Sequence, residues 1–93
     1  MKITDLKDTA EMMQSADYKE RFKAEYNQTK IRLEKLKKFN TKIEAAQTTQ
    51  FTPNPLEEPK HDCPLELLKA QEKIMGEYLH LLEIRAVIEG IEL

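Results

Sequence analysis

The stretch that most constrains the fold is residues 47–63, "QTTQFTPNPLEEPKHDC", which holds three of the chain's four prolines. Proline lacks a backbone N–H and clashes with the preceding helical turn, so this stretch cannot continue a helix. It is polar and has no apolar periodicity, which indicates a connection between elements. The chain on either side holds only one proline and two glycines. We therefore expect two long segments joined by this connection.

The segment before the connection is predicted to be a helix over residues 17–46. Asp17 precedes "YKE", so its carboxylate and Glu20 match a capping box at a helix start. The inward positions then repeat at spacings of four and three, as in a heptad seam. They are Phe22, Tyr26, Thr29, Leu33, Leu36, Asn40 and Ile43. In front of this helix, within residues 1–16, a short helix over about residues 5–13 could start at Thr4.

The short helix is expected to place Leu6, Ala10 and Met13 on one side. Those three side chains bury too little surface for the helix to stand alone. It should therefore dock on the rest of the chain or on a neighbouring chain.

The segment after the connection is predicted to be a helix over residues 64–90. Pro64 suits a first helical turn, and Gly90 can take the left-handed conformation that ends a helix. Its apolar residues cover an arc of roughly 180°, wider than the roughly 100° stripe that one core needs. They are Leu67, Leu68, Ile74, Met75, Tyr78, Leu79, Leu81, Leu82, Ala86 and Ile88. Ile84, Val87 and Ile91 lie outside the arc, on the face that should be polar, which indicates contacts beyond a two-helix pair.

These patterns predict an all-α fold and a single domain over residues 1–93. The expected architecture is an antiparallel two-helix hairpin with a short N-terminal helix, assembling into a homo-oligomer. Charge favours the pairing, because residues 18–46 hold nine Lys and Arg against four acids, whereas residues 64–93 hold three against six.

Three polar residues, Gln71, Tyr78 and Arg85, lie seven apart along the centre of the apolar arc. If position 46 faces position 64 in an antiparallel pair, Asn40 meets Gln71 and Tyr26 meets Arg85. One interpretation is that these pairs fix helix register and oligomer order. The other is that they line a pocket between chains, in which Arg85 binds a phosphate and Tyr26 or Tyr78 stacks on a base.

Composition favours a cytoplasmic binding protein over an enzyme. "HDC" at residues 61–63 lacks the spaced ligand pairs of a zinc site, and no histidine is placed to activate Cys63, so we expect no metal, no cofactor and no catalysis. The net charge of −2 makes nucleic acid an unexpected partner. A single cysteine fits a reducing compartment, and the N-terminus lacks the apolar core of a signal peptide. No apolar run approaches the roughly 18 residues of a membrane span.

Two stretches, "DYKERFKAEYNQTKIRLEKL" and "LELLKAQEKIMGEYLHLLEIRAVIEGIEL", resemble small helical-hairpin proteins of tailed phages and prophages of gut bacteria, including a crAss-like-phage-related family. That resemblance implies a phage origin, the cytoplasm of an infected bacterium, and a helical hairpin. The architecture is also similar to that of phage counter-defence proteins that assemble into multimers and trap nucleotide immune signals. The "RA" at Arg85 and Ala86 is similar to theirs, but the residues that follow depart from their pattern.

Three functions follow from these observations. The leading hypothesis is a counter-defence protein that sequesters a nucleotide-type signal in pockets of a homo-oligomer. Its expected ligand-binding residues are Tyr18, Arg21, Phe22, Tyr26, Lys30, Tyr78 and Arg85. The alternatives are an inhibitor that docks a helix onto a host defence protein, with Ile84, Val87 and Ile91 as anchors, and an assembly helper without a ligand.

Overall fold

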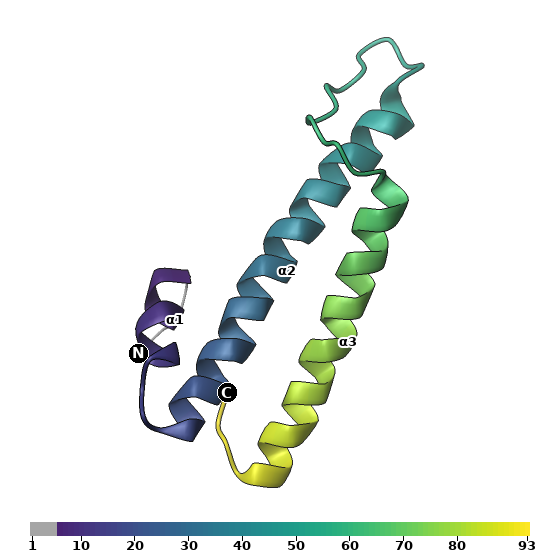
Figure 1. Cartoon of the computed structure of the whole chain (residues 1–93). Coiled ribbons are helices and arrows are strands. Elements are labelled where there is room, and N and C mark those ends of the chain that lie inside the picture. The colour runs from purple at the N-terminus through teal and green to yellow at the C-terminus, as the bar shows by residue number, and fades with distance from the viewer. Residues whose placement is uncertain (1–5) are drawn as a thin grey trace.

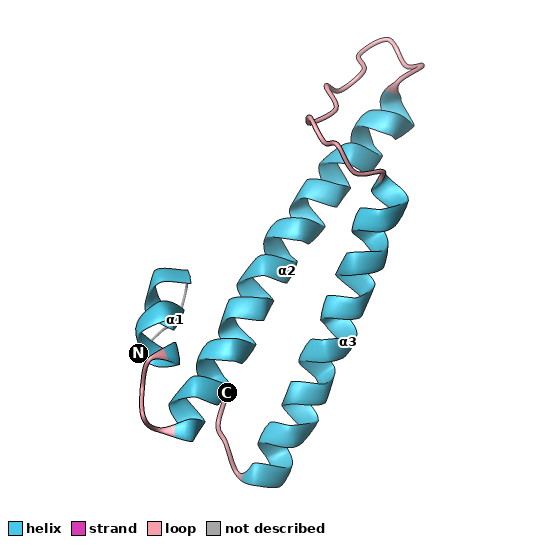
Figure 2. Cartoon of the chain, in the orientation of Figure 1, coloured by secondary structure: helices cyan, strands magenta, loops and turns pink. Residues whose placement is uncertain are grey.

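The computed structural model describes residues 6–93, which form three α-helices: α1 (Leu6–Met13), α2 (Tyr18–Thr49) and α3 (Leu65–Glu89) (Figure 1). The predicted all-helical class is confirmed, and the described residues contain no strand (Figure 2). None of these helices combines the length and apolar character needed to cross a bilayer.

The two long helices lie side by side and run in opposite directions (Figure 1). Cross-contacts mark their register from one end to the other. Lys69 bonds Glu44 at 3.0 Å near the connection, and the Tyr18 hydroxyl donates to Glu89 at 2.9 Å at the far end. Higher residue numbers on α2 thus face lower numbers on α3, close to the register predicted from the sequence.

The start of α2 is capped at the predicted residue but with a different bond. The Asp17 carboxylate accepts from the backbone N–H of Lys19 at 2.9 Å, and not from that of Glu20. At its other end, α2 continues three residues beyond the predicted boundary. The hydroxyls of Thr48 and Thr49 donate to carbonyls four residues back, so both side chains find their hydrogen-bond partners within the helix.

The end of α3 contains a correction to the sequence prediction. Gly90 takes a left-handed conformation, with φ of 69°, and the N–H of Ile91 donates to the Ala86 carbonyl at 2.8 Å. This is a Schellman turn, which folds the next apolar side chain back onto its own helix. Ile91 is therefore buried in the same chain, whereas Val87 is 83% exposed, as expected for the outer face.

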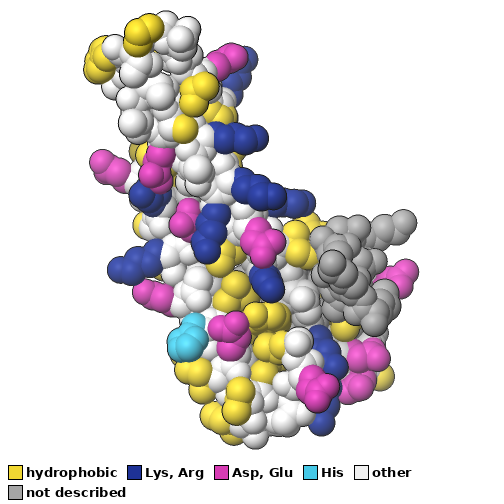
Figure 3. Space-filling model, turned by 180° about the vertical axis from the view of Figure 1, so that it is seen from behind, with side chains coloured by type: hydrophobic (Ala, Val, Ile, Leu, Met, Phe, Trp, Pro, Cys, Tyr) yellow, Lys and Arg dark blue, Asp and Glu magenta, His cyan; other side chains and the backbone are white. Residues whose placement is uncertain are grey.

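Ile43 and Ala46 are buried near the connection, and the main core cluster lies between α2 and α3, in the half of the molecule where α2 begins and α3 ends. It comprises Phe22, Tyr26, Leu33, Leu79, Leu82, Ala86 and Ile91, with Met75 packed against it. Figure 3 shows the molecule from behind, where hydrophobic side chains gather toward this lower end, beside charged side chains of both signs that continue higher up. Only one side of the predicted apolar arc of α3 thus contributes to the core.

The short helix α1 packs against α2, but not through the predicted side. Thr9 is fully buried and its hydroxyl donates to the Leu6 carbonyl at 2.7 Å, whereas Ala10 and Met13 are exposed. The threonine can be buried because its own helix satisfies its hydroxyl. The expected helix start at Thr4 lies outside the described residues.

Deleting residues 1–14 should lower the melting temperature by about 5 °C or more, because losing even about 1 kcal/mol has that effect in a domain of this size. The deletion removes the contacts of α1 with α2, including the burial of Thr9. Thermal unfolding followed by circular dichroism measures the change. An unaltered melting temperature would mean that α1 contributes nothing to stability.

Asn40 is almost fully buried on α2, yet it is only half satisfied. Its amide donates to Glu72 at 3.1 Å, while its buried Oδ1 has no partner within residues 6–93. Asn40→Leu should therefore raise the free energy of unfolding by about 1–2 kcal/mol, because a buried unpaired polar atom costs about that much. Urea denaturation tests this, and a loss of stability would indicate that the amide is satisfied by water.

Candidate functional site

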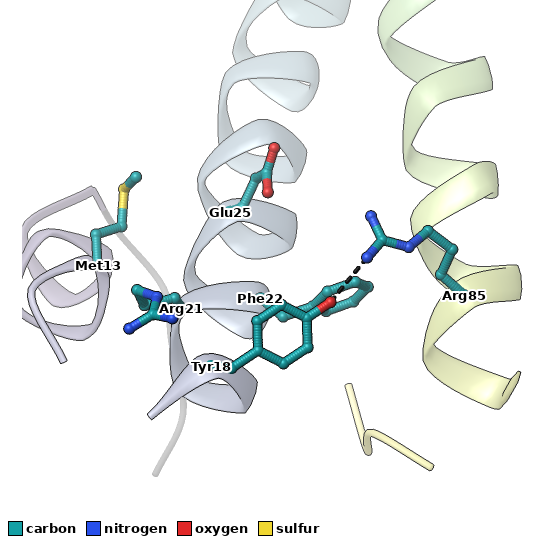
Figure 4. Close-up of a pocket in the computed structure, with 6 residues that line it drawn as sticks. All are labelled: Met13, Tyr18, Arg21, Phe22, Glu25 and Arg85. Atoms are coloured by element: carbon teal, nitrogen blue, oxygen red, sulfur yellow. Dashed lines mark hydrogen bonds between the residues drawn. The ribbon is translucent and has the colours of Figure 1, made fainter. Parts of the chain in front are cut away.

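A pocket of about 290 Å³ lies where α1, α2 and α3 come together, next to the start of α2 and the end of α3. Figure 4 shows its side chains, which come from all three helices, with Tyr18 and Phe22 extending toward Arg85. They are Met13, Tyr18, Arg21, Phe22, Glu25 and Arg85. Two guanidinium groups, two aromatic rings and one carboxylate therefore share one concavity. Its volume is at the small end of the range for small-molecule sites.

Arg85 is held in place by three contacts. Its Nη2 donates to the Tyr18 hydroxyl at 2.7 Å and its Nε donates to Glu89 at 3.2 Å, while its guanidinium carbon lies 5.1 Å from the centroid of the Phe22 ring. Tyr18 in turn donates to Glu89, which closes a three-residue network. The pKa of Tyr18 is raised, chiefly by that hydrogen bond. The side chain of Arg85 nevertheless remains 53% exposed.

These two bonds occupy two of the five N–H groups of Arg85. Within the described residues, the other three remain for a ligand. A guanidinium can offer parallel N–H groups to the two oxygens of a phosphate or carboxylate. The network thus orients Arg85 while leaving most of its donors toward solvent.

Arg21 contributes charge from the opposite side of the pocket. Its Nη1 donates to the carbonyls of Ser15 and Ala16, at 2.9 and 3.1 Å, which ties the connection between α1 and α2. Phe22 is buried beneath the pocket and inclined to the Tyr18 ring, with centroids 6.2 Å apart. The floor is therefore aromatic and the rim cationic.

Tyr78 lies at the edge of the pocket. Its hydroxyl donates to Glu25, and this hydrogen bond is the main cause of its raised pKa. Glu25 is thus positioned by a neutral phenol and keeps its remaining lone pairs for other donors.

A second pocket, of about 310 Å³, holds the other predicted residues. Tyr26 and Lys30 line it together with Gly76, Glu83 and other residues of α2 and α3. Because an α-helix turns by about 100° per residue, Glu83 and Arg85 point roughly 160° apart on α3. The two pockets therefore lie on opposite faces of the helix pair.

The structure thus divides the seven predicted site residues into two groups. The first pocket is lined by Tyr18, Arg21, Phe22 and Arg85. Tyr78 bonds to Glu25 of the same pocket. The second pocket is lined by Tyr26 and Lys30. The sequence prediction missed Met13 and Glu25. The spacing of positions 18, 22 and 25 on one helix face could have identified Glu25.

The predicted polar ladder is wrong in its partners. Tyr26 donates to Glu83 at 2.8 Å and not to Arg85, and Asn40 donates to Glu72 and not to Gln71. Gln71 and Arg85 are exposed. The reason is that α2 meets α3 on a side of the apolar arc away from Gln71 and Arg85. The glutamate side chains at the edge of the interface, Glu72 and Glu83, therefore reach the polar groups of Asn40 and Tyr26.

The first pocket brings together guanidinium groups and aromatic rings, which are the groups that proteins use to hold an anion and a flat ring. Over residues 6–93, no three His, Cys, Asp or Glu side chains gather in an arrangement that could hold a metal ion. Cys63 is exposed in the connection, at the opposite end of the helix pair from the pocket (Figure 1).

Tyr26 makes folding stability depend on pH in the alkaline range. Burial, followed by the hydrogen bond to Glu83, raises its pKa to about 12, above the ordinary value of about 10. A raised folded-state pKa contributes stability below pH 10 that is lost as the pH rises through 12. Between pH 9 and 11.5, stability in urea should fall more for the wild type than for Tyr26→Phe. Equal falls would show that Tyr26 ionises as freely in the folded chain as in the unfolded one.

Comparison of the chain with known protein families gives one match. No curated protein and no solved structure matches the chain. The family model described as Sequestin matches residues 16–88, which include both long helices almost entirely and every residue of the first pocket except Met13. The chain therefore belongs to the Sequestin family.

Proposed function

We propose that this protein binds a small, phosphate-bearing ligand of the nucleotide type in the pocket at Arg85 and withholds it unchanged. The observation that carries the proposal is the convergence of Arg21, Arg85, Tyr18 and Phe22 on one concavity. A family named for sequestration is compatible with such a role.

Each group has a distinct part in this proposal. Arg85 offers its outward N–H groups to a phosphate, and Arg21 adds positive charge across the pocket. The ring of Tyr18, 45% exposed, offers a face on which a base can stack. The Glu25 carboxylate accepts from a sugar hydroxyl or a base amino group. Selectivity for a nucleotide over free phosphate then comes from the ring and the carboxylate.

The biological role that fits best is counter-defence by a phage or prophage protein in the cytoplasm of an infected bacterium, acting as a homo-oligomer. A cyclic oligonucleotide or an ADP-ribose derivative has the required phosphate and base. Binding without catalysis is part of the proposal: the pocket holds the ligand and releases it unchanged. Docking onto a host defence protein remains the alternative, favoured by exposed side chains such as Val87.

Native mass spectrometry of the purified protein, alone and mixed with ADP-ribose, cyclic di-AMP, AMP or inorganic phosphate, tests the proposal. We expect the mass of the protein to increase by the mass of one of the nucleotides. The same spectra report how many chains the oligomer contains. Absence of any nucleotide adduct, or equal retention of inorganic phosphate alone, would contradict it. Capture of a host protein in place of a nucleotide would support the alternative.

A further inference from the structure

Gly76 lies in the middle of α3, where no contact within residues 6–93 calls for a glycine. Its φ is not positive, unlike that of Gly90, so its backbone conformation suits other residues. A Cβ added at Gly76 would meet nothing within 4 Å beyond its own helical turn. Glycine also weakens a helix interior relative to alanine. A glycine of this kind is typical of a place where another molecule approaches the backbone closely.

The space left open at Gly76 belongs to the second pocket, of about 310 Å³, between α2 and α3. Two buried side chains, Leu33 and Leu79, line this pocket beside the glycine and form its floor. The floor is therefore apolar and includes bare backbone. A flat ring can lie against such a floor, because no side chain at position 76 holds it away.

Charged side chains of α2 line the same pocket. Lys30 and Lys37 are exposed and lie seven residues apart, which is about two turns, on the same side of the helix. Within residues 6–93, neither these lysines nor Glu34 between them forms an ion pair. Lysine ammonium groups bind phosphate as point charges. The lysines can thus receive a phosphate without first losing a partner among the described residues.

Glu83 adds a carboxylate from α3 and is held in place. Its Oε2 accepts from the hydroxyl of the buried Tyr26 at 2.8 Å, and its Oε1 lies 3.6 Å from Nδ1 of His80. The side chain of Glu83 is still 49% exposed, so the carboxylate keeps acceptor sites for a ligand. With Glu34, it balances the charge of the two lysines. A ligand that matches this pocket therefore has hydrogen-bond donors as well as negative charge.

We infer that the second pocket is a separate binding site for a nucleotide with an amino-bearing base. The base lies over Gly76, its amino group donates to Glu83, and the phosphate meets the lysines. The apolar floor favours such a ring over a small zwitterion such as a free amino acid. The two pockets share no lining residue and lie on opposite faces, so both can be filled at once. The inference goes beyond the proposed function and uses none of its residues.

Titration of the isotope-labelled full chain with AMP, followed by its amide signals in NMR spectra, tests the inference. The chain has only two glycines, so the signal of Gly76 is readily assigned. It should move and saturate at millimolar AMP, equally in the wild type and in Arg85→Met. Inosine monophosphate has a carbonyl oxygen in place of the amino group. It should bind about tenfold more weakly, as for the loss of a hydrogen bond to a charged group.

The outcomes of this titration separate the two pockets. A Gly76 signal that does not move, or equal affinity for AMP and inosine monophosphate, would overturn the inference. If the signals of Tyr18 and Arg85 move while that of Gly76 does not, the proposed function stands without the second site. If the signal of Gly76 moves while those two do not, the second site stands and the first pocket does not bind AMP.

Two substitutions of Gly76 separate folding from binding. Gly76→Ala should raise the melting temperature by about 4 °C, and a lower melting temperature would show that the fold itself needs the glycine. Gly76→Leu should fold but bind AMP about tenfold more weakly or worse, measured at the amides of Leu79 and Glu83, because its side chain occupies the floor. Ala70→Leu is the matched control, since Ala70 is exposed on α3 and lines neither pocket. Equal AMP affinity of the two leucine variants would overturn the inference.

Lys37→Met and Lys38→Met test the role of the lysines. Both remove one positive charge from an exposed position of α2, but only Lys37 lines the second pocket. Lys37→Met should weaken AMP binding at Gly76 about tenfold, and Lys38→Met should leave it within about twofold of the wild type. Equal effects of the two variants in the same titration would show that the phosphate does not lie at Lys37 and would overturn the placement.

Discussion

Arg85→Met will fold normally and bind its nucleotide ligand about 10- to 100-fold more weakly than the wild type, because it removes a charged hydrogen-bond donor worth about 1.5–3 kcal/mol. Folding survives because the side chain is half exposed and its partners Tyr18 and Glu89 remain bonded to each other. Methionine keeps the apolar contact with Phe22. Isothermal titration with ADP-ribose and cyclic di-AMP measures the change in affinity.

Arg32→Met is the matched control for this variant. Arg32 is an exposed arginine on α2 that does not line the pocket at Arg85, so its loss changes net charge equally without touching the site. Its affinity should stay within about twofold of the wild type, since distant surface charges are screened by salt. If the Arg85→Met and Arg32→Met variants bound the nucleotide equally tightly, Arg85 would not contact the ligand and would serve only the hydrogen-bond network with Tyr18 and Glu89.

Leu82→Ala will lower the free energy of unfolding by about 2–5 kcal/mol, the usual result of truncating a buried leucine. Leu82 is only 1% exposed and packs in the core cluster between α2 and α3. The total free energy of unfolding of a chain of this size is roughly 5–10 kcal/mol, so the melting temperature should fall by about 10 °C or more.

Val87→Ala is the control for that prediction, because it truncates an aliphatic side chain of α3 that is 83% exposed. Its stability should stay within about 0.5 kcal/mol of the wild type. Similar losses for Leu82→Ala and Val87→Ala in chemical denaturation would contradict the placement of the core.

The helices were predictable because their ends carry local signals. Asp17 accepts from a backbone N–H at the start of α2, Pro64 precedes the first turn of α3, and Gly90 ends that helix in a left-handed conformation. Each of these preferences acts within a few residues of the chain. The same is true of the prolines in the connection. The predicted boundary at residue 46 was three residues short, because Thr48 and Thr49 are accommodated in the helix by hydroxyl bonds to carbonyls four residues back.

The candidate site was only partly predictable because a helical wheel gives directions around each helix but not which direction meets the neighbour. Arg85 lies at the centre of the apolar arc, so the sequence indicated burial, but α2 packs to one side of it and leaves it half exposed. Tyr26 was assigned to the same pocket, yet it bonds Glu83 on the opposite face. Ile91 was misplaced because the Schellman turn reverses the chain after Gly90.

Recovery of intact ligand from the complex tests the central claim, sequestration without conversion, most directly. Protein in slight excess over ADP-ribose or cyclic di-AMP is passed through a filter that retains the protein, and the bound fraction is then released by heat and analysed by chromatography. We expect one of the two nucleotides to disappear from the filtrate and to be recovered chemically unchanged after denaturation. Nucleotides that remain wholly in the filtrate, or that are recovered as a different compound, would contradict it.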